Sequence, residues 1–259
     1  FKNYLMLKKR IIFSLLYKDG SFCLSRNFNL QKVGNLNWIK KNYDFSLIAK
    51  SIDELIILNV SDENNSVSKF CKTIELLSRE CFLPLSIGGK IDSLNIAQKY
   101  MQAGADKLVI NTNLFNKNLL KRISKIFGEQ CLIGSVDYTR DKKKFKFLTK
   151  NGKQQNKIKT KELFDKVLEL PVGELILNSI DRDGTGNGFD YSILNLIPKK
   201  FLKPIIFSGG AGNYLHFVEA LRKSKIHSVT TANLINFVGN GLQEARALVK
   251  KNGINLAEW

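Results

Sequence analysis

Few residues of this sequence can bind a metal ion or form a disulfide bond. The chain has two histidines and four cysteines, and the cysteines are Cys23, Cys71, Cys81 and Cys131. Successive cysteines lie 48, 10 and 50 positions apart, whereas metal and redox motifs place them a few residues apart. We therefore expect no metal ion and no cofactor. We interpret the cysteines as buried thiols in a reducing cytoplasm.

Long apolar runs are also missing. No apolar stretch approaches the roughly 20 residues that a helix needs to cross a membrane, which argues against a membrane protein. Short apolar segments are frequent, and 44% of the residues are hydrophobic. That fraction is enough to build a large core and excludes a disordered chain. We expect a globular cytoplasmic protein.

Arginine is scarce, and this changes how the net charge of +18 is interpreted. Such a charge is typical of nucleic-acid binders. However, lysine supplies 33 of the 41 positive side chains and arginine only eight. Nucleic-acid readers favour arginine, because its planar guanidinium contacts phosphates and guanine with two hydrogen bonds. The 25 asparagines point to a general compositional bias instead, so we expect no nucleic-acid partner.

Short apolar runs alternate with amphipathic runs along the whole chain. The predicted strands are Ile11–Tyr17, Glu54–Val60, Leu83–Ile87, Lys107–Ile110, Cys131–Tyr138, Glu174–Ile180, Pro204–Ser208 and Ser228–Thr231. The predicted helices are 36–50, 66–81, 92–103, 116–127, 160–170, 191–199, 213–223 and 241–252. Eight such units predict an α/β fold, a single (β/α)8 barrel domain over residues 1–259. The alternative, an open doubly wound sheet, lacks its glycine fingerprint after the first strand.

The sequence repeats itself at an offset of about half its length. Ile12–Tyr17 matches Ile133–Tyr138 at an offset of 121, and Pro84–Gly89 matches Pro204–Gly209 at an offset of 120. Two separate segments that share nearly one offset indicate a duplicated half-barrel. We call these parts the first half and the second half.

A basic segment follows the fifth predicted strand. Residues 140–161 hold ten lysines or arginines and one acid, which is half of the net charge. The alternation over 144–149, followed by Asn151-Gly152, predicts a hairpin with a type I′ turn. We interpret it as a solvated hairpin on the barrel rim. Alternatives are a docking surface for an acidic partner, or a non-enzymatic scaffold that binds nucleic acid.

Glycine-rich loops follow the same strand in both halves. In a barrel, function lies in the loops at the carboxyl ends of the strands, and glycine lets backbone amides approach a phosphate. The candidate phosphate-binding residues are Gly88, Gly89, Asn111, Thr112, Gly184, Thr185, Ser208, Gly209, Gly210, Ala232 and Asn233. Each half thus offers a cradle for one end of an anionic ligand. Lys90 replaces a third glycine of the first cradle, where it either adds charge or obstructs the site.

Two aspartates are candidates for acid/base chemistry. Asp137 ends the fifth predicted strand and Asp183 lies in the glycine-rich loop after the sixth. A carboxylate at this rim can transfer protons if burial raises its pKa. The structural alternative is that Asp183 forms a turn and that Asp137 pairs with a nearby arginine.

Together these motifs resemble HisF, the cyclase subunit of imidazole glycerol-phosphate synthase. The matching segments are Lys9-Arg10-Ile11-Ile12, Lys18-Asp19-Gly20, Asp53-Glu54-Leu55, Gly104-Ala105-Asp106-Lys107, Ile110-Asn111-Thr112, Asp181-Arg182-Asp183-Gly184-Thr185 and Ser208-Gly209-Gly210-Ala211-Gly212. The resemblance runs from Met6 to about Gly253. It implies a lyase-family barrel that receives ammonia from a HisH-like glutaminase and uses it on a ribonucleotide with two phosphates.

The residues at the barrel floor agree with this family. The resemblance implies an ammonia gate of four charged residues, Arg10, Glu54, Lys107 and Glu174. Asp106 matches an aspartate of the glutaminase interface. Charges at a barrel floor can also simply pair with one another. The presence of two acids and two bases at positions that match the family's gate favours the gate over simple pairing.

The residues at the catalytic end depart from the family. Asp137 matches one of two essential aspartates, but the other falls on Leu16. A substrate-binding lysine falls on Leu24, and another aspartate falls on Asn59. Leucine cannot transfer a proton, and loss of one acid/base group typically lowers the rate 10²–10⁴-fold. Cyclase activity is therefore in doubt.

This combination resembles the WbuZ-type HisF paralogues of surface-polysaccharide synthesis. These are implied to work with a HisH-like glutaminase and a separate amidotransferase, which convert an acetamido group of a nucleotide-activated sugar to an acetamidino group. Our leading hypothesis is such an ammonia-conducting subunit, with a phosphorylated or nucleotide-sugar ligand. The second hypothesis is the cyclase of histidine biosynthesis, with Asp137 and Asp183 as its acid/base pair. The scaffold using residues 140–161 is the third.

Overall fold

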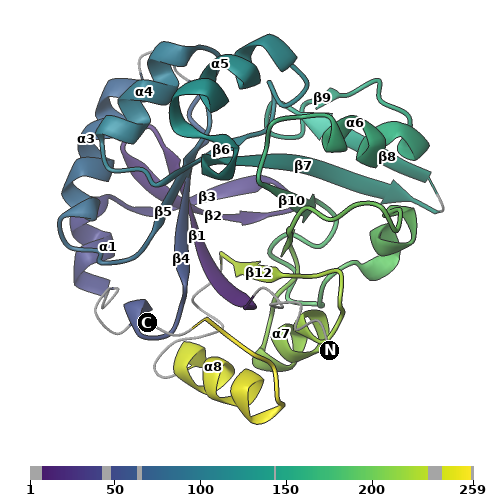
Figure 1. The fold of residues 1–259 in the computed structure, drawn as a ribbon. Coiled ribbons are helices and arrows are strands. Elements are labelled where there is room, and N and C mark those ends of the chain that lie inside the picture. Colours follow the sequence, from purple (N-terminus) through teal and green to yellow (C-terminus); the bar gives the residue numbers. More distant parts are fainter. Residues whose placement is uncertain (1–7, 43–47, 63–65, 143, 233–240, 258–259) are drawn as a thin grey trace, which may run out of the picture.

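The strands form a closed parallel barrel (Figure 1). The computed structural model describes residues 8–42, 48–62, 66–142, 144–232 and 241–257. The eight barrel strands are β1 (Arg10–Lys18), β4 (Glu54–Asn59), β5 (Leu85–Gly88), β6 (Lys107–Ile110), β7 (Leu132–Asp141), β10 (Glu174–Ser179), β11 (Ile205–Ser208) and β12 (Ser228–Thr231). Strand β1 pairs in parallel with both β4 and β12, and β7 pairs with β10, which closes the ring. The predicted (β/α)8 barrel is confirmed.

Helices surround these strands, as the period of the apolar residues predicts (Figure 1). They are α1 (Leu36–Asn42), α3 (Ser66–Ser78), α4 (Leu94–Gln102), α5 (Lys117–Phe127), α6 (Leu163–Leu168), α7 (Tyr214–Leu221) and α8 (Gly241–Lys251). Asparagine and serine side chains cap α4, α5 and α7 at their first turns. No helix of the described ranges is long and apolar enough to span a bilayer.

One predicted helix is wrong in type. Residues 191–199 were expected to be α-helical, but the chain forms the 3-10 helix η3 (Tyr191–Leu196). Two shorter 3-10 helices, η1 (Glu129–Cys131) and η2 (Thr160–Glu162), precede β7 and α6. Ile197 is extended because Pro198 follows it, and a residue before proline disfavours the α-helical conformation. The segment therefore stops after two short turns.

The inside of the barrel is built in layers. Alternate residues of each strand point inward. A middle layer of six aliphatic side chains packs against itself, and its members are Ile12, Ile56, Val109, Ile133, Ile176 and Ile206. A larger apolar core fills the space between the strands and the helices. The polar ends of the barrel are thus separated by an apolar middle.

A hairpin that the sequence analysis did not foresee follows β1. Strand β2 (Ser21–Arg26) pairs antiparallel with β1 and with β3 (Asn29–Gly34). Asn27 and Phe28 form its two-residue turn, with φ angles of 50° and 63°. We call Ser21–Gly34 the mouth hairpin, because it lies over the carboxyl ends of the strands.

A second hairpin extends β7 and carries the basic segment. Strand β8 (Lys144–Thr149) pairs with β7, and β9 (Gln154–Gln155) pairs with β8. Asn151 and Gly152 form the centre of its turn, as predicted: both have positive φ angles, 56° and 77°, as a type I′ turn requires, and the N–H of Lys153 donates to the Lys150 carbonyl oxygen at 3.2 Å. Thr149 pairs with Gln154, so the loop between the two strands consists of residues 150–153. We call residues 150–153 the rim loop. The lysines of 140–161 that the structure describes have exposed side chains.

The two halves match in three dimensions. Gly89 and Gly209, which are 120 positions apart, have φ angles of 90° and 88°. A Cβ atom would lie 2.0 Å from the Asn59 carbonyl oxygen at Gly89 and 2.5 Å from that of Ser179 at Gly209. Both positions require glycine for the same reason: the backbone of the preceding barrel strand lies against them.

Candidate functional site

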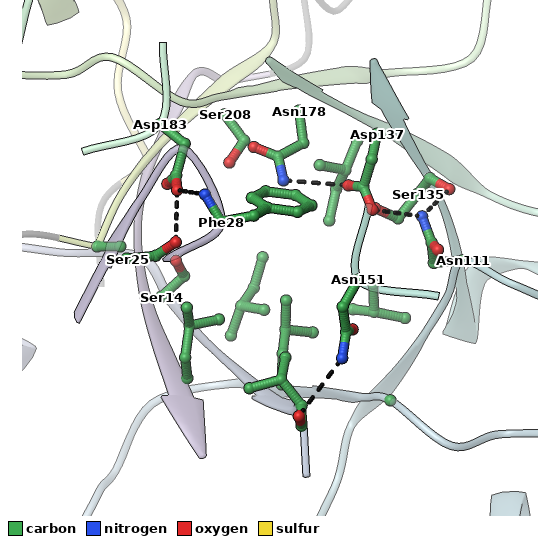
Figure 2. Close-up of a pocket in the computed structure, with 18 of the residues that line it drawn as sticks. Ser14, Ser25, Phe28, Asn111, Ser135, Asp137, Asn151, Asn178, Asp183 and Ser208 are labelled. Atoms are coloured by element: carbon green, nitrogen blue, oxygen red, sulfur yellow. Dashed lines mark hydrogen bonds between the residues drawn. The ribbon is translucent and has the colours of Figure 1, made fainter. Parts of the chain in front are cut away.

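A cavity of about 470 Å³ opens at the carboxyl ends of the barrel strands (Figure 2). Asp137 and Asp183 both line it, so the structure brings the two predicted acids to one pocket. The walls between them are largely apolar, with Leu16, Leu24 and Phe28 on the side of the mouth hairpin. This is the face at which barrel proteins carry their sites.

Asp137 is a buried carboxylate held by two amides. Asn111 Nδ2 donates to its Oδ2 at 3.1 Å, and Asn178 Nδ2 donates to its Oδ1 at 3.1 Å. Burial raises the pKa of Asp137 from 3.8 to about 7; the two amides oppose this rise and the charge of Asp183 adds to it. A group that titrates near neutral pH can both accept and donate a proton. The structural alternative, in which Asp137 pairs with an arginine, does not hold among the described residues, because its partners are these two amides.

Asp183 is occupied by the mouth hairpin. The hydroxyl of Ser25 donates to Asp183 Oδ2 at 2.5 Å, and the backbone N–H of Phe28 donates to the same oxygen at 3.0 Å (Figure 2). Burial raises the pKa of Asp183, and these two hydrogen bonds oppose the rise. Gly184 lets the hairpin approach, since a Cβ there would lie 2.0 Å from the Ser25 carbonyl oxygen. The carboxylate therefore fixes the hairpin over the pocket.

The positions that depart from the family pattern make ordinary apolar or structural contacts. Leu16 and Leu24 line the pocket, and Leu16 pairs in register with Cys23 of the mouth hairpin. Asn59 accepts a hydrogen bond from the N–H of Ser61 at 3.2 Å. None of these three side chains can supply a proton at neutral pH. Of the four acids in the described lining of this pocket, Asp62 and Asp92 are exposed, whereas Asp137 and Asp183 are not.

The predicted phosphate-binding residues fall into three groups. Those that line the pocket are Gly89, Asn111, Thr112, Gly184, Ser208, Gly209, Gly210 and Ala232. Gly88 and Thr185 lie outside the lining. Asn233 lies outside the described residues. The amide of Asn111 is already used, because it donates to Asp137 and to the Ser135 carbonyl oxygen.

The four predicted gate residues meet at the opposite end of the barrel and form a closed ring of ion pairs. Lys107 Nζ lies 3.2 Å from Glu54 Oε2 and 2.7 Å from Glu174 Oε1. Arg10 bridges the same two glutamates, at 2.8 Å from Glu54 Oε2 and in direct contact with Glu174. We call these four residues the floor ring. Despite its burial, Glu174 has a lowered pKa because of the charges of Arg10 and Lys107.

Comparison with known proteins agrees with this geometry. A family model described as histidine biosynthesis protein matches residues 30–238. The chain is 43% identical over 256 residues to a candidate imidazole glycerol phosphate synthase subunit, hisF2, of Parasynechococcus marenigrum, covering 98% of this chain and 95% of that protein. It is 33% identical over 253 residues to the imidazole glycerol phosphate synthase subunit HisF of Chlorobium phaeovibrioides, covering 97% and 99%. The chain belongs to the HisF family.

A second cavity, of about 360 Å³, lies beneath the floor ring of this HisF-family chain, and Arg10, Glu174 and His227 line it. His227 and Asp106 occupy equivalent positions in the two halves. Asp106 Oδ2 accepts the N–H of Leu85 at 2.8 Å, and His227 Nδ1 accepts the N–H of Ile205 at 3.2 Å. Both side chains therefore cap the start of a barrel strand.

Several residues of the HisF-family site had no clear signal in the sequence. They are Ser25, Phe28, Asn178, Lys150 and Lys153, and all five line the cavity at the carboxyl ends of the strands. We call that cavity the upper cavity, and the one beneath the floor ring the lower cavity. The two lysines are exposed, as expected for the basic segment, but their place at the edge of the cavity was not foreseen. Within the described ranges, no group of three histidines, cysteines or acids is placed to hold a metal ion.

Proposed function

We propose that this chain is a HisF-type subunit that takes up ammonia at the barrel floor and delivers it to the upper cavity. A HisH-like glutaminase is the source of the ammonia, and Asp106 lies in the surface that this partner covers. The names of the HisF relatives support membership of a synthase assembled from subunits. The geometry of the two cavities supports the direction of transfer.

The observation that carries the proposal is that the two cavities approach each other across one layer of side chains. The lower cavity reaches Arg10 and Glu174 of the floor ring. The upper cavity reaches Ile56, Val109 and Ile176. Each of these three follows a ring residue by two positions, which is about 7 Å along a strand. In the described part of the chain, the floor ring thus separates the two spaces.

The chemistry of this passage favours neutral ammonia. Above the ring, a small solute meets the aliphatic middle layer. An ammonium ion would lose its hydration there without gaining a charged partner, which costs many kcal/mol. Ammonia carries no charge and crosses an apolar layer at far lower cost. The ring itself holds its charges in pairs, so opening it requires the ion pairs to separate.

The fate of the ammonia follows from the upper cavity. Leu16 and Leu24 line the places where the family has an acid and a substrate-binding lysine. We therefore propose that the ammonia serves amidation of a nucleotide-activated sugar by a separate amidotransferase, as in the WbuZ-type paralogues. The 43% identity to a protein named hisF2 supports a paralogue.

One observation favours the cyclase of histidine biosynthesis as a second candidate. The pKa of Asp137 is about 7, which suits proton transfer in a cyclisation. A direct assay separates the candidates: the purified chain receives ammonium and the histidine-pathway ribonucleotide, with a HisF from Chlorobium as positive control. We expect no turnover above background. Turnover at the rate of the control would establish the cyclase and overturn the amidation proposal.

A labelling experiment tests the transfer itself. The chain is purified with its glutaminase and amidotransferase and is given glutamine labelled with ¹⁵N in its amide, together with an acetamido nucleotide sugar. We expect ¹⁵N in an acetamidino product, and at least a tenfold loss with Glu174→Gln. The matched control is Glu169→Gln, which alters an exposed ion pair with Lys117. Equal labelling by both variants would show that ammonia does not pass the floor ring.

A further inference from the structure

We propose that Lys90 and Lys150 turn the first-half end of the upper cavity into a binding site for a diphosphate group. This inference rests on the proposed function, because a nucleotide-activated sugar carries such a group. Both lysines line the cavity. Among the residues that the structure describes, neither takes part in an ion pair.

Lys90 occupies a backbone conformation that lysine does not favour. Its φ angle is 60°, in the left-handed region, which strains a residue that has a Cβ. Glycine would avoid this strain, and the equivalent second-half position is Gly210. The side chain lies at the pocket wall, where a folding role does not require a lysine. Binding of an anion accounts for its presence.

The two halves differ in whether this position has room for a side chain. At Gly210, a Cβ would lie 2.2 Å from the Gly188 carbonyl oxygen, because the loop after β10 packs against it. The first half has Lys90 at this place, beside Gly89 and facing the cavity. In the described part of the chain, residues 208–211 of the second-half cradle therefore offer backbone amides and the Ser208 hydroxyl, while the first-half cradle offers a cation as well.

The rim loop is fastened so that Lys150 adjoins the first-half cradle. The N–H of Lys150 donates to Thr112 Oγ1 at 3.3 Å. Asn151 Nδ2 donates to the Val60 carbonyl oxygen at 3.4 Å, which is the dashed line from Asn151 in Figure 2. Lys153 forms an ion pair with Asp62 at 3.2 Å. These contacts join the loop to the ends of β4 and β6, on either side of β5. The cradle that contains Lys90 follows β5.

The acids near this end of the cavity do not cancel the positive charge of Lys90 and Lys150. Asp62 is bound by Lys18 at 2.6 Å as well as by Lys153, so its charge is more than compensated. Asp92 also lines the cavity and offsets one lysine. Lys90, Lys150 and Lys153 line this end together with Asp62 and Asp92. Lys18 lies outside the lining but pairs with Asp62. When Lys18 is included, these side chains carry an excess of two positive charges.

Among the residues that the structure describes, the opposite end has no such excess. It is lined by Ser208, Gly209, Gly210 and Ala211, with no lysine or arginine in that part of the described lining, and Leu16 of β1 lies between the two ends. A ligand with one phosphate at each end would meet unequal sites. A ligand with two adjacent phosphates at one end matches the charge distribution. Lysine suits this role, because its ammonium group is a point charge that does not require a planar partner.

Titration calorimetry with the isolated full chain tests the site. The probes are inorganic pyrophosphate and inorganic phosphate at fixed ionic strength, and the variants are Lys90→Gly and Lys150→Ala. We expect pyrophosphate to bind at least tenfold more tightly than phosphate, and each variant to weaken pyrophosphate binding about tenfold. The matched control, Lys157→Ala in the same basic segment, should bind like the parent chain.

The Lys90→Gly variant also excludes misfolding as an explanation. Glycine accepts the left-handed conformation, so this variant should melt at the same temperature as the parent or higher. Undiminished pyrophosphate binding by Lys90→Gly would overturn the proposal. So would equal affinities of the parent for the two probes.

A competition arm separates free pyrophosphate from a nucleotide sugar. UDP-N-acetylglucosamine should displace pyrophosphate from the parent chain, and a failure to compete would overturn the diphosphate-sugar assignment. None of these measurements uses a glutaminase or ammonia. A chain that binds both probes through Lys90 and Lys150, but transfers no ¹⁵N, would therefore retain this site while the proposed function fails.

Discussion

Asp137→Asn should make the protein more stable at alkaline pH, because the ionised carboxylate is buried in the upper cavity. The pKa of Asp137 is about 7 in the folded chain, against an ordinary value of 3.8. The folded state therefore keeps its proton over a pH range in which the unfolded state releases it. Stability is complete below pH 3.8 and declines as the pH rises through about 7.

The size of this decline follows from the pKa difference. At 1.36 kcal/mol for each pKa unit, the step from 3.8 to about 7 corresponds to about 4 kcal/mol. Asparagine removes the charge but cannot accept from both Asn111 and Asn178, since one of its terminal atoms is now a donor. That loss costs about 1–3 kcal/mol. The net gain of the variant above pH 7 is about 2 kcal/mol.

Urea unfolding at pH 4.5 and pH 8.5 checks this prediction. The free energy of unfolding of Asp137→Asn should exceed that of the parent at pH 8.5 and should match it or fall below it at pH 4.5. Asp141→Asn, at the exposed end of the same strand, is the matched control and should show no such crossover. If the difference between Asp137→Asn and the parent were the same at both pH values, the carboxylate would not be the buried group described here.

Three further predictions concern the floor ring, the mouth hairpin and the strand cap. Glu54→Gln should lower the free energy of unfolding by about 3 kcal/mol, because two partly buried cations lose the buried carboxylate that they share; a change below about 1 kcal/mol in urea unfolding would contradict the ring's contribution to stability. Asp183→Asn should speed hydrogen exchange in residues 21–34 and leave exchange in the barrel strands unchanged, because the hydrogen bonds to Asp183 hold only the mouth hairpin. Equally faster exchange in the hairpin and in the barrel strands would contradict this local role. Burial and the charge of Lys9 lower the pKa of His227 below 6.5, so stability should fall as the pH drops below 6.5; His227→Asn should flatten that part of a melting-temperature profile.

The barrel could be predicted from the sequence because its signal is repeated. Each of the eight apolar strands is followed by an amphipathic run, so eight separate units indicate the same parallel α/β architecture. An internal offset near 120 positions supports it independently. Errors were confined to single segments, such as residues 191–199, where one proline decides between an α-helix and a 3-10 helix.

The floor ring was predicted through the resemblance to HisF, because two acids and two bases stand at positions that match the family's gate. The mouth hairpin was not. Its turn is Asn27-Phe28, and a phenylalanine with φ of 63° is not a residue that signals a turn. Tertiary contacts maintain this strained turn: Asp183 binds both Ser25 and Phe28, from more than 150 positions away along the chain. No local pattern can reveal a contact of that kind.

The floor ring has a further consequence for how quickly the molecule comes apart. Its ion pairs join residues that are 44, 53, 67 and 164 positions apart. Such contacts form after the long loops between them have closed, and so they develop late on the folding pathway. Interactions that are absent from the transition state slow unfolding and leave the folding rate nearly unchanged. The ring should therefore act as a kinetic lock, which sets the lifetime of the closed barrel more than the speed at which it assembles.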